Sequence, residues 1–296
     1  MSGSAERGFR RRRSVLFVPA SNPRALEKAR GLPWDAVVLD LEDSVAPEMK
    51  AEARAAAVQA LSAAFGGREV AVRCNGLDTP WGADDLAALA RGGAGAAPDA
   101  VLAPKISGAD DLAAYDRALA AAPASTRLWA MIETARGVLD LKEIAAASAS
   151  TRLAALVLGP NDLSLDLRLR PAPGRAALVP ILSALVVAAR AHGLSALDGA
   201  YNDFENAAGF EAECRQGRDF GFDGKTLIHP TQIAAANRAF SPSADEIAWA
   251  RAVVAAFAAP EAEGKGAIRL GGRMIERLHL VEAERTLRFA GMSSPM

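Results

Sequence analysis

The chain has 296 residues, enough for two modest domains or for one α/β barrel of about 250 residues. Its 34 Lys and Arg residues nearly balance 35 Asp and Glu residues, which argues against nucleic acid or an anionic membrane as a partner. Cys74 and Cys214 are too few for a disulfide framework and lack metal-site spacing. The run VLFVPA is too short for a signal peptide, and no run is expected to span a membrane. We therefore expect a cytoplasmic protein.

Strands and helices are expected to alternate along the chain. Residues 1–12 lack apolar periodicity and are expected to be disordered, with the basic run Arg10–Arg13 solvated. Short apolar runs then predict strands at 14–19, 35–41, 67–73, 99–105, 128–133, 153–160, 194–201 and 222–230. The stretches between them predict helices at 21–30, 48–63, 83–90, 108–122, 176–193 and 205–216, with a further helical segment after the fifth strand. Residues 92–98 are expected to be a turn, and 164–175 an ordered excursion or a mobile flap.

Eight consecutive strand–helix units predict an α/β fold. They favour a closed (β/α)8 TIM barrel over an open doubly wound sheet. Neither GxGxxG nor a P-loop motif occurs, which argues against the commonest nucleotide-binding folds. With a final helix at 243–258, the barrel domain is expected to cover residues 13–258. Residues 259–296 begin in charged, Gly-rich sequence and end in a strand pair and a helix. They predict a C-terminal lid that reaches over its own barrel mouth or a neighbour's.

Charged and titratable side chains gather where the predicted strands end. They are Asp40, Glu42, Asp43, Arg73, Lys105, Glu133, Asp162, Asp198 and His229. In a barrel these ends converge on one face. Glu133 and Asp162 follow successive strands, so the pair is placed to share one divalent cation, and oxygen ligands favour Mg²⁺. The alternative is that both acids are helix caps or solvated loop residues.

Two other residues of this set have more than one interpretation. Lys105 could form a Schiff base with a carbonyl substrate, but an ion pair with the acids after the second strand is favoured. His229, which precedes Pro230, is interpreted as a hydrogen-bonded structural group rather than a general base.

These residues lie in motifs that resemble one known family. RSVLFVPASNPRALEKA, DAVVLDLEDSVAP, AVRCNG, LAPK, MIETARGV, LGPNDL, LDGAYNDFENAAGF, GFDGKTLIHPTQI and GGRMIE occur in the order seen in the citrate lyase beta-subunit and malyl-CoA lyase family. These are CoA ester lyases of the HpcH/HpaI aldolase superfamily. The resemblance extends from Arg13 to about Leu287, and the combination of motifs is highly specific.

The resemblance implies a TIM barrel with a lid, a requirement for Mg²⁺ (or Mn²⁺), and a homotrimer or homohexamer. Glu133 of the MIET motif and Asp162 of the GPNDL motif match the family's metal ligands, and Glu133 also borders the substrate. Arg73 of the VRxN motif matches the substrate-contacting arginine. The opening segment matches the border of the CoA nucleotide through Phe17, Pro19, Arg24 and Lys28.

The implied reaction cleaves or forms the carbon–carbon bond of a 3-hydroxyacyl-CoA such as citryl-, malyl- or citramalyl-CoA. Its products are a 2-oxo acid and acetyl-CoA or a related acyl-CoA. Arg73 would stabilise the enolate or thioester oxygen, and an acid would protonate the enolate carbon. The family's acid is the aspartate of a MID-x-P motif, whereas this chain has MIERLHL, with Glu276 at that position and Leu278 in place of proline.

Glu276 keeps the carboxylic acid but adds a methylene, and a shift of about 1 Å in a catalytic group can cost on the order of a hundredfold in rate. Two alternatives therefore remain beside the lyase. One is a malyl-CoA-type thioesterase on the same scaffold. The other is a subunit similar to citrate lyase beta that acts within a complex.

Overall fold

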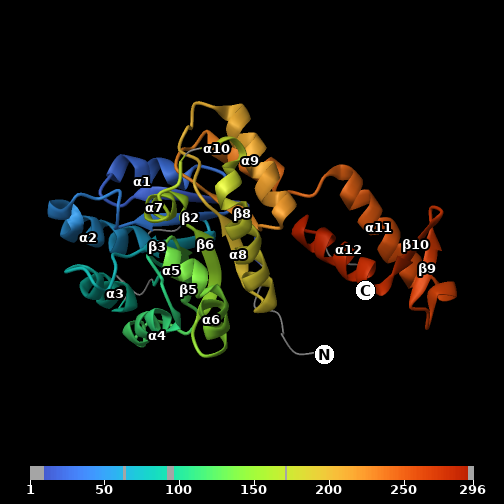
Figure 1. Ribbon diagram of the computed structural model, residues 1–296, viewed down its shortest axis with the longest axis horizontal. Coiled ribbons are helices and arrows are strands. Elements are labelled where there is room, and N and C mark those ends of the chain that lie inside the picture. Colours follow the sequence, from blue (N-terminus) through green and yellow to red (C-terminus); the bar gives the residue numbers. More distant parts are fainter. Residues whose placement is uncertain (1–9, 63–64, 92–96, 171, 293–296) are drawn as a thin grey trace. The chain divides into compact units, whose positions relative to one another are not determined.

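The structure, a computed structural model, describes residues 10–62, 65–91, 97–170 and 172–292 (Figure 1). Parts of five expectations lie outside these residues: the tail at 1–9, the end of the helix at 63, most of the turn at 92–98, position 171 of the excursion and the last four residues of the lid. The chain divides into two compact units, the first ending at Ala239 and the second beginning at Phe240. Each unit is described by itself.

The first unit contains a closed barrel of eight strands in sequence order, and neighbouring strands are parallel. The strands are β1 (Ser14–Pro19), β2 (Ala36–Asp40), β3 (Glu69–Arg73), β4 (Ala100–Ala103), β5 (Arg127–Ile132), β6 (Leu153–Leu158), β7 (Ser195–Asp198) and β8 (Gly224–Leu227). The barrel closes where β1 pairs with β8, with Ser14 opposite Lys225. The predicted (β/α)8 fold is confirmed.

Helices connect the strands in the alternation that the sequence predicts. Those of the first unit are α1 (Pro23–Arg30), α2 (Lys50–Leu61), α3 (Gly82–Arg91), α4 (Ala109–Ala118), α5 (Ala135–Leu139), α6 (Leu141–Ala146), α7 (Pro160–Asp166), α8 (Val179–Ala191), α9 (Ala207–Phe220) and α10 (Gln232–Ala239). Short 3₁₀ segments lie at Pro47–Met49, Ala147–Ala149 and Pro173–Leu178.

Alternate residues of the strands fill the barrel interior, as expected for side chains that point to opposite faces along a strand. Several of these positions are alanine, for example Ala36, Ala71 and Ala155, and they leave the space that Trp129 and Met131 occupy. The small alanine side chains therefore make room for one large aromatic ring in the core. Trp129 is fully buried.

Arg10 and Arg11 are exposed, as the sequence predicts, whereas Arg12 and Arg13 are not solvated. Arg12 donates to both carboxylate oxygens of Glu69 at 2.7 and 2.8 Å, and Arg13 does the same to Asp35 at 2.7 and 2.8 Å. Glu69 begins β3 and is only 4% exposed. A buried carboxylate needs a cation nearby, so these arginines neutralise acids at the start of the barrel strands.

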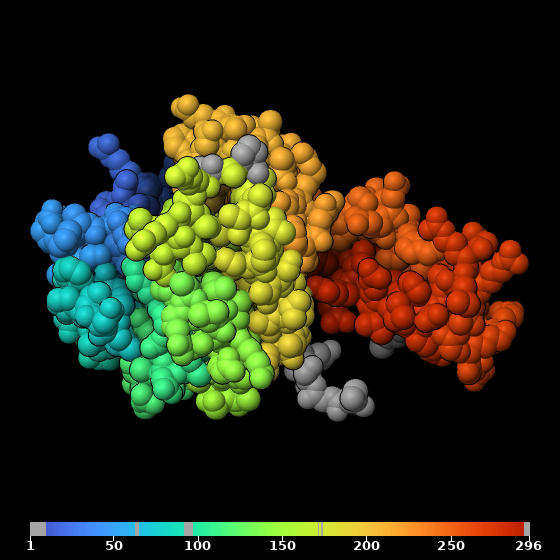
Figure 2. Space-filling view, in the orientation of Figure 1, coloured from blue at the N-terminus to red at the C-terminus, as the bar shows by residue number. Residues whose placement is uncertain are grey.

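The predicted excursion at 164–175 is partly helical. Its first residues belong to α7, which begins at Pro160, a residue favoured at the first position of a helix. The long apolar helix expected at 176–193 is the end of a 3₁₀ segment followed by α8. By length and composition Gly174–Ala191 could cross a membrane, contrary to expectation. Leu182 and Leu185 on its inner face are buried, whereas its outer face lies on the surface (yellow in Figure 2).

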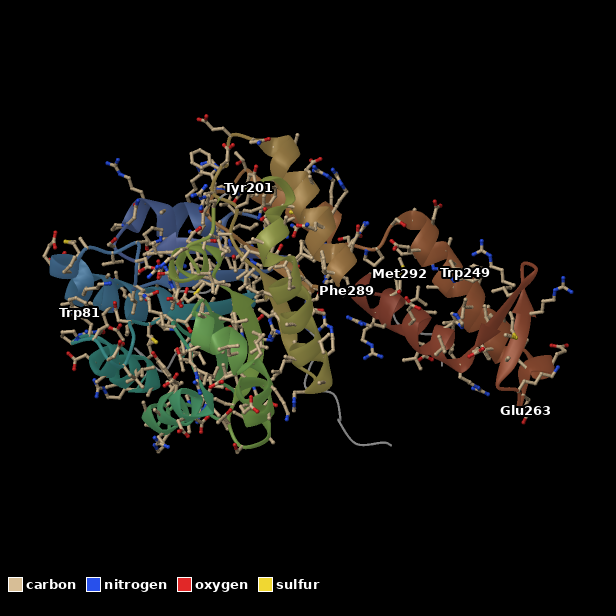
Figure 3. The ribbon with its side chains drawn as sticks, viewed as in Figure 1. Trp81, Tyr201, Trp249, Glu263, Phe289 and Met292 are labelled. Carbon is tan, nitrogen blue, oxygen red and sulfur yellow. The ribbon has the colours of Figure 1, made fainter. Side chains whose placement is uncertain are left out.

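The second unit has its own small core. It contains α11 (Ala244–Ala258), a 3₁₀ turn (Pro260–Ala262), the antiparallel strands β9 (Ala267–Leu270) and β10 (Arg273–Glu276), and α12 (Arg277–Phe289). Val253 and Phe257 of α11 pack with Leu287 of α12, and Met292 lies against this cluster (Figure 3). The boundary placed after residue 258 is therefore corrected to 239/240, because α11 packs with the tail.

Candidate active site

A cavity of about 340 Å³ lies at the carboxyl ends of the barrel strands. Five residues to which the resemblance assigns a role line it, namely Phe17, Pro19, Arg73, Glu133 and Asp162. Asp40 and Asp43 line it as well. The cavity therefore brings together the expected metal ligands, the expected substrate arginine and part of the expected CoA segment.

Arg73, at the end of β3, is held firmly at the cavity wall. Its Nε and Nη2 donate to the two oxygens of Asp40 at 2.6 and 2.7 Å, and its Nη1 donates to Asp43 at 3.2 Å. The guanidinium also lies 5.1 Å from the ring centre of Phe17. Burial alone would lower the pKa of Arg73, but the charge and hydrogen bonds of Asp40 outweigh burial and raise it. The side chain is a fixed cation with a single orientation.

Glu42 joins this arginine to Lys105. Its Oε1 accepts a hydrogen bond from Lys105 Nζ at 2.6 Å. Its Oε2 lies 2.9 Å from Arg73 Nη1, yet this buried oxygen has no partner in hydrogen-bonding geometry. Burial works to lower the pKa of Lys105, but the bond and charge of Glu42 outweigh it and raise that pKa. A protonated amine favours the predicted ion pair over a Schiff base, which needs the neutral amine.

Glu133 is almost completely buried, with 1% of its surface exposed. Its Oε1 accepts the backbone N–H of Lys105 at 2.8 Å. Gly159 lies against its side chain so closely that a Cβ at residue 159 would be 2.4 Å from Glu133 Oε2. Burial, followed by the charge of Glu42, raises the pKa of Glu133 to about 8. A nearby cation would favour the ionised form.

Asp162, the third residue of α7, is half-buried and faces the same cavity as Glu133. The charges around the two carboxylates bear on whether a divalent cation fits there. Five carboxylates lie at this mouth, and three cationic side chains face them: Asp40, Glu42, Asp43, Glu133 and Asp162 against Lys50, Arg73 and Lys105. Once Glu133 is ionised, the form that a bound cation favours, these carboxylates exceed the three cations by two charges, and the oxygen-only donor set fits Mg²⁺ or Mn²⁺.

Glu133 and Asp162 are the two residues that could hold this ion directly. Within the described ranges, no group of three or more His, Cys, Asp or Glu side chains is arranged as a metal site. A Mg²⁺ ion that is bound by one or two carboxylates and otherwise by substrate and water needs no such group.

Other predicted strand-end residues lie outside the cavity. Asp198 is fully buried and paired with Arg175 at 2.7 Å and Lys225 at 3.0 Å, so its oxygens are already engaged. His229 bonds Thr231 at 2.8 Å and stacks on Phe204 with 4.7 Å between ring centres. The structural interpretation of His229 agrees with these contacts.

The remaining predicted residues are exposed or belong to the second unit. Arg24 and Lys28 lie on the exposed side of α1, and within the described part of the chain neither side chain makes a hydrogen bond or ion pair. Glu276 ends β10. Its backbone N–H donates to His279 Nδ1 at 2.9 Å, and this hydrogen bond is part of the N-terminal cap of α12. The roles of these three residues stay predictions.

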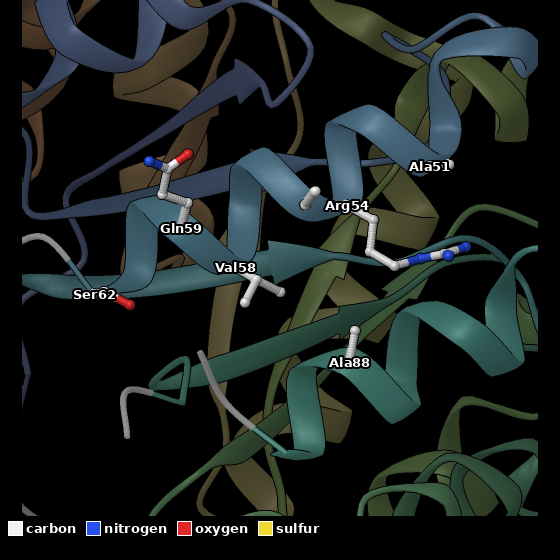
Figure 4. Close-up of a pocket in the computed structure, with 7 residues that line it drawn as sticks. Ala51, Arg54, Val58, Gln59, Ser62 and Ala88 are labelled. Carbon is white, nitrogen blue, oxygen red and sulfur yellow. The ribbon is translucent and has the colours of Figure 1, made fainter. Parts of the chain in front are cut away.

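Two further concavities carry less chemistry. One, of about 470 Å³, lies between α2 and α3, and small or uncharged residues make up most of its lining (Figure 4). Its one charged lining residue, Arg54, is already bonded to Asp85 at 2.6 Å. The other lies in the second unit around Lys265, Ile268 and Arg269.

Sequence reasoning missed several residues at the mouth. Lys50 is 6% exposed, and its Nζ donates to the carbonyls of Leu41 and Glu42 at 2.8 and 2.7 Å. Lys225 is fully buried within β8. The signal for Lys225 was present in the sequence, since a lysine inside a predicted barrel strand, here GKTL, has no solvent to reach and needs carboxylate partners.

Fold and site together define a (β/α)8 barrel whose candidate active site is an acidic cavity with a fixed arginine at the C-terminal mouth. The chain belongs to the family described as HpcH/HpaI aldolase/citrate lyase, which it matches over residues 13–230. The resemblance inferred from the motifs is therefore confirmed.

Three known proteins illustrate the range of this family. The chain is 48% identical over 276 residues to a (3S)-malyl-CoA thioesterase of Cereibacter sphaeroides, covering 93% of each chain. It is 36% identical over 306 residues to an L-malyl-CoA/beta-methylmalyl-CoA lyase of the same species, covering 95% of each. The crystal structure of CitE from Mycobacterium tuberculosis, in complex with magnesium, acetoacetate and coenzyme A, is 35% identical, with a TM-score of 0.76 over 94% of this chain and 97% of CitE.

Proposed function

We propose that this chain is a Mg²⁺-dependent lyase that cleaves or forms the carbon–carbon bond of a 3-hydroxyacyl-CoA, such as malyl-, citramalyl- or citryl-CoA. The observation that carries this proposal is the single cavity that Glu133 and Asp162 share with Arg73. An enzyme of this class needs two carboxylates for a metal and one cation for a developing negative charge, and the cavity offers both.

Glu133 and Asp162 would hold the ion. When bound, Mg²⁺ would act as a Lewis acid on the substrate oxygen that becomes the ketone. Arg73 is held by Asp40 with its charge beside the cavity, so it needs no reorganisation when negative charge develops on the thioester oxygen.

In the cleavage direction the 3-hydroxyl group loses its proton and the bond between C2 and C3 breaks. The electron pair of that bond passes into the thioester, giving the enolate of the acyl-CoA and a 2-oxo acid. Glu276 would then give its proton to C2, and in the condensation direction it would remove that proton. The proton released by the 3-hydroxyl group passes to water, and the Glu276 carboxylate takes a proton back from water, so the carboxylic acid is restored at each turnover.

The thioesterase is a second candidate, and two observations favour it. The 48% identical relative is named as a malyl-CoA thioesterase. Glu276, with its extra methylene, also replaces the aspartate expected for a lyase. In this reaction water attacks the thioester carbonyl, the C–S bond breaks, and a 3-hydroxy acid and free CoA leave.

One assay separates the two reactions. Purified protein is incubated with (3S)-malyl-CoA and Mg²⁺, and free thiol, glyoxylate, acetyl-CoA and malate are measured. The lyase gives equal amounts of glyoxylate and acetyl-CoA without free thiol, whereas the thioesterase gives malate and thiol. Activity of the chain alone would also argue against a subunit that needs a complex. If both reactions persisted after treatment with EDTA, the metal assignment would be contradicted.

We also propose that the active form is a cytoplasmic homotrimer or homohexamer. Sedimentation equilibrium of the purified chain tests the assembly, since a monomer at micromolar concentration would contradict it.

A further inference from the structure

We propose that a buried ion network behind the mouth positions the metal-binding carboxylates. The network consists of Arg175, Asp198, Glu213 and Lys225. The inference rests on the proposed function, because that function assigns Glu133 and Asp162 to a metal ion. None of the four network residues lines the cavity, so each would act through its neighbours rather than on substrate.

The network holds Gly199 by both of its backbone groups. Lys225 is fully buried and donates to Asp198 Oδ2 at 3.0 Å, to Glu213 Oε1 at 2.7 Å and to the carbonyl oxygen of Gly199. Asp198 Oδ1 accepts the Gly199 N–H at 2.8 Å and Arg175 Nη1 at 2.7 Å. The residue that follows β7 is therefore fixed at its donor and at its acceptor.

Gly199 in turn lies flush against the start of α7. A Cβ at this glycine would be 2.4 Å from Pro160 Cδ and 2.8 Å from the Leu158 carbonyl oxygen. Gly159, the residue before Pro160, packs on Glu133 in the same way, and a Cβ at residue 159 would be 2.6 Å from Glu133 Cβ. An unbroken series of contacts thus leads from the network through two glycines to one metal carboxylate.

The second metal carboxylate, Asp162, is connected to the network through the same segment. Asp162 lies two residues after Pro160 in α7. Asn161, between them, accepts a hydrogen bond from Asn202 Nδ2 at 2.7 Å, which ties α7 a second time to the loop after β7. Both carboxylates therefore depend on where the segment beginning at Gly199 sits.

Arg175 anchors the far end of the segment that follows α7. Its φ of +53° is unfavourable for a residue with a Cβ. The conformation is retained by contacts with Asp198, with Glu213 at 3.4 Å and with Gln216 at 2.9 and 3.0 Å. The chain from α7 to the start of α8 is consequently fixed at both ends by groups of β7, β8 and α9.

The competing explanation is that these four charges only stabilise the barrel. Removing a residue that supports a metal ligand typically weakens metal affinity tenfold to a hundredfold. A purely stabilising network would lower thermal stability without changing metal affinity, so the two explanations differ in one measurable quantity.

Mn²⁺ binding without substrate, measured by electron paramagnetic resonance, tests the inference. Lys225→Met is compared with wild type, with Glu133→Gln and with the control Glu69→Gln, which breaks a buried ion pair at the opposite ends of the strands. We expect Lys225→Met to weaken Mn²⁺ binding about tenfold to a hundredfold, Glu69→Gln to keep the wild-type affinity, and both to lower the melting temperature.

Two results would overturn the inference, and they are distinguishable. Wild-type affinity in Lys225→Met, while Glu133→Gln binds no Mn²⁺, rejects the positioning role and leaves the proposed function standing. Absence of Mn²⁺ binding by wild type rejects the metal assignment and the inference with it.

Gly199→Ala gives a second test should Lys225→Met not fold. It keeps all four charges and pushes a methyl group against Pro160, so Mn²⁺ binding should weaken to a similar degree. Gly31→Ala, where no atom lies within 4 Å of the added Cβ, is its control. Unchanged affinity in Gly199→Ala would overturn the inference.

Discussion

Lys105 holds Glu133 through its backbone and not through its side chain. The Lys105 N–H donates to Glu133 Oε1 at 2.8 Å, whereas its Nζ reaches Glu42 Oε1 at 2.6 Å. Its φ of +52° is costly for a residue with a Cβ. One strained residue therefore fixes Glu133 in the cavity wall and Glu42 beside it. The donor to Glu133 is a backbone N–H, which no substitution other than proline can remove.

The fixed orientation of Arg73 predicts that lysine cannot replace it. Arg73→Lys keeps the positive charge but loses the two parallel hydrogen bonds to Asp40, so the cation no longer points to one place. We expect kcat to fall by about 10²-fold to 10³-fold, the cost of losing one donor to a developing oxyanion. Steady-state kinetics measures this, with Arg136→Lys in an exposed pair as control. A kcat within twofold of wild type would show that Arg73 serves only the fold.

The raised pKa of Glu133 predicts how the stability of metal-free protein depends on pH. The pKa is about 8 in the folded protein and 4.5 in an ordinary glutamate, so between these values the folded state binds more protons than the unfolded state. Raising the pH through this window therefore lowers the free energy of unfolding, with a slope of at most about 1.4 kcal/mol per pH unit. Urea unfolding in EDTA at pH 5.5, 6.5 and 7.5 measures the slope. Glu133→Gln should lack it, and identical slopes in both proteins would contradict the assignment.

The two exposed cations of α1 predict a selective effect on CoA ester binding. Arg24 and Lys28 are four residues apart and therefore share one face of the helix. Replacing both by alanine should raise KM for the CoA ester about tenfold or more while kcat changes little, because uniform binding is lost. Lys142→Ala on the exposed side of α6 is the matched control. If KM stays at the wild-type value, the nucleotide binds elsewhere.

Replacing Glu276 by glutamine is expected to abolish proton transfer without loss of substrate binding. Glu276→Gln removes the acid but keeps the shape, so hydrogen exchange at the C2 carbon of acetyl-CoA in D₂O should stop while CoA ester affinity persists. Glu276→Asp tests whether the extra methylene suits this site.

A lid that acts on a neighbouring subunit would allow complementation. Inactive Glu276→Gln and Glu133→Gln proteins, mixed under conditions of subunit exchange, should then recover part of the activity. Full activity of Glu276→Gln alone would mean that the chain uses another acid or that it catalyses no proton transfer to carbon.

The sequence predicted the barrel well because its signal is local. Most strands are apolar runs, as expected for parallel strands covered on both faces, and each of the eight predicted runs overlaps one strand. The ends were less accurate: the runs at 99–105 and 194–201 contain strands of four residues, Ala100–Ala103 and Ser195–Asp198. The residues beyond each strand are the loops that carry the polar groups.

Long-range pairing explains what the sequence did not predict. Arg12 has its partner Glu69 57 residues away, and Arg175 has its partner Asp198 23 residues away, so neither pair is visible as a local pattern. Burial was misjudged for the same reason. The alternative interpretation of Glu133 was a helix cap or a solvated loop residue, yet it is 1% exposed because Gly159 and the backbone of Lys105 enclose it.

The pairing of β1 with β8 has a consequence for synthesis on the ribosome. Val15 bonds its neighbour β2 early, but its partner on the other side, Thr226, is among the last barrel residues to emerge. Until then β1 is an open strand edge, a surface prone to pair with other chains. Closing a contact of such sequence separation is intrinsically slow. The nascent chain therefore spends most of its synthesis as an unclosed sheet, the stage at which a chaperone would protect it best.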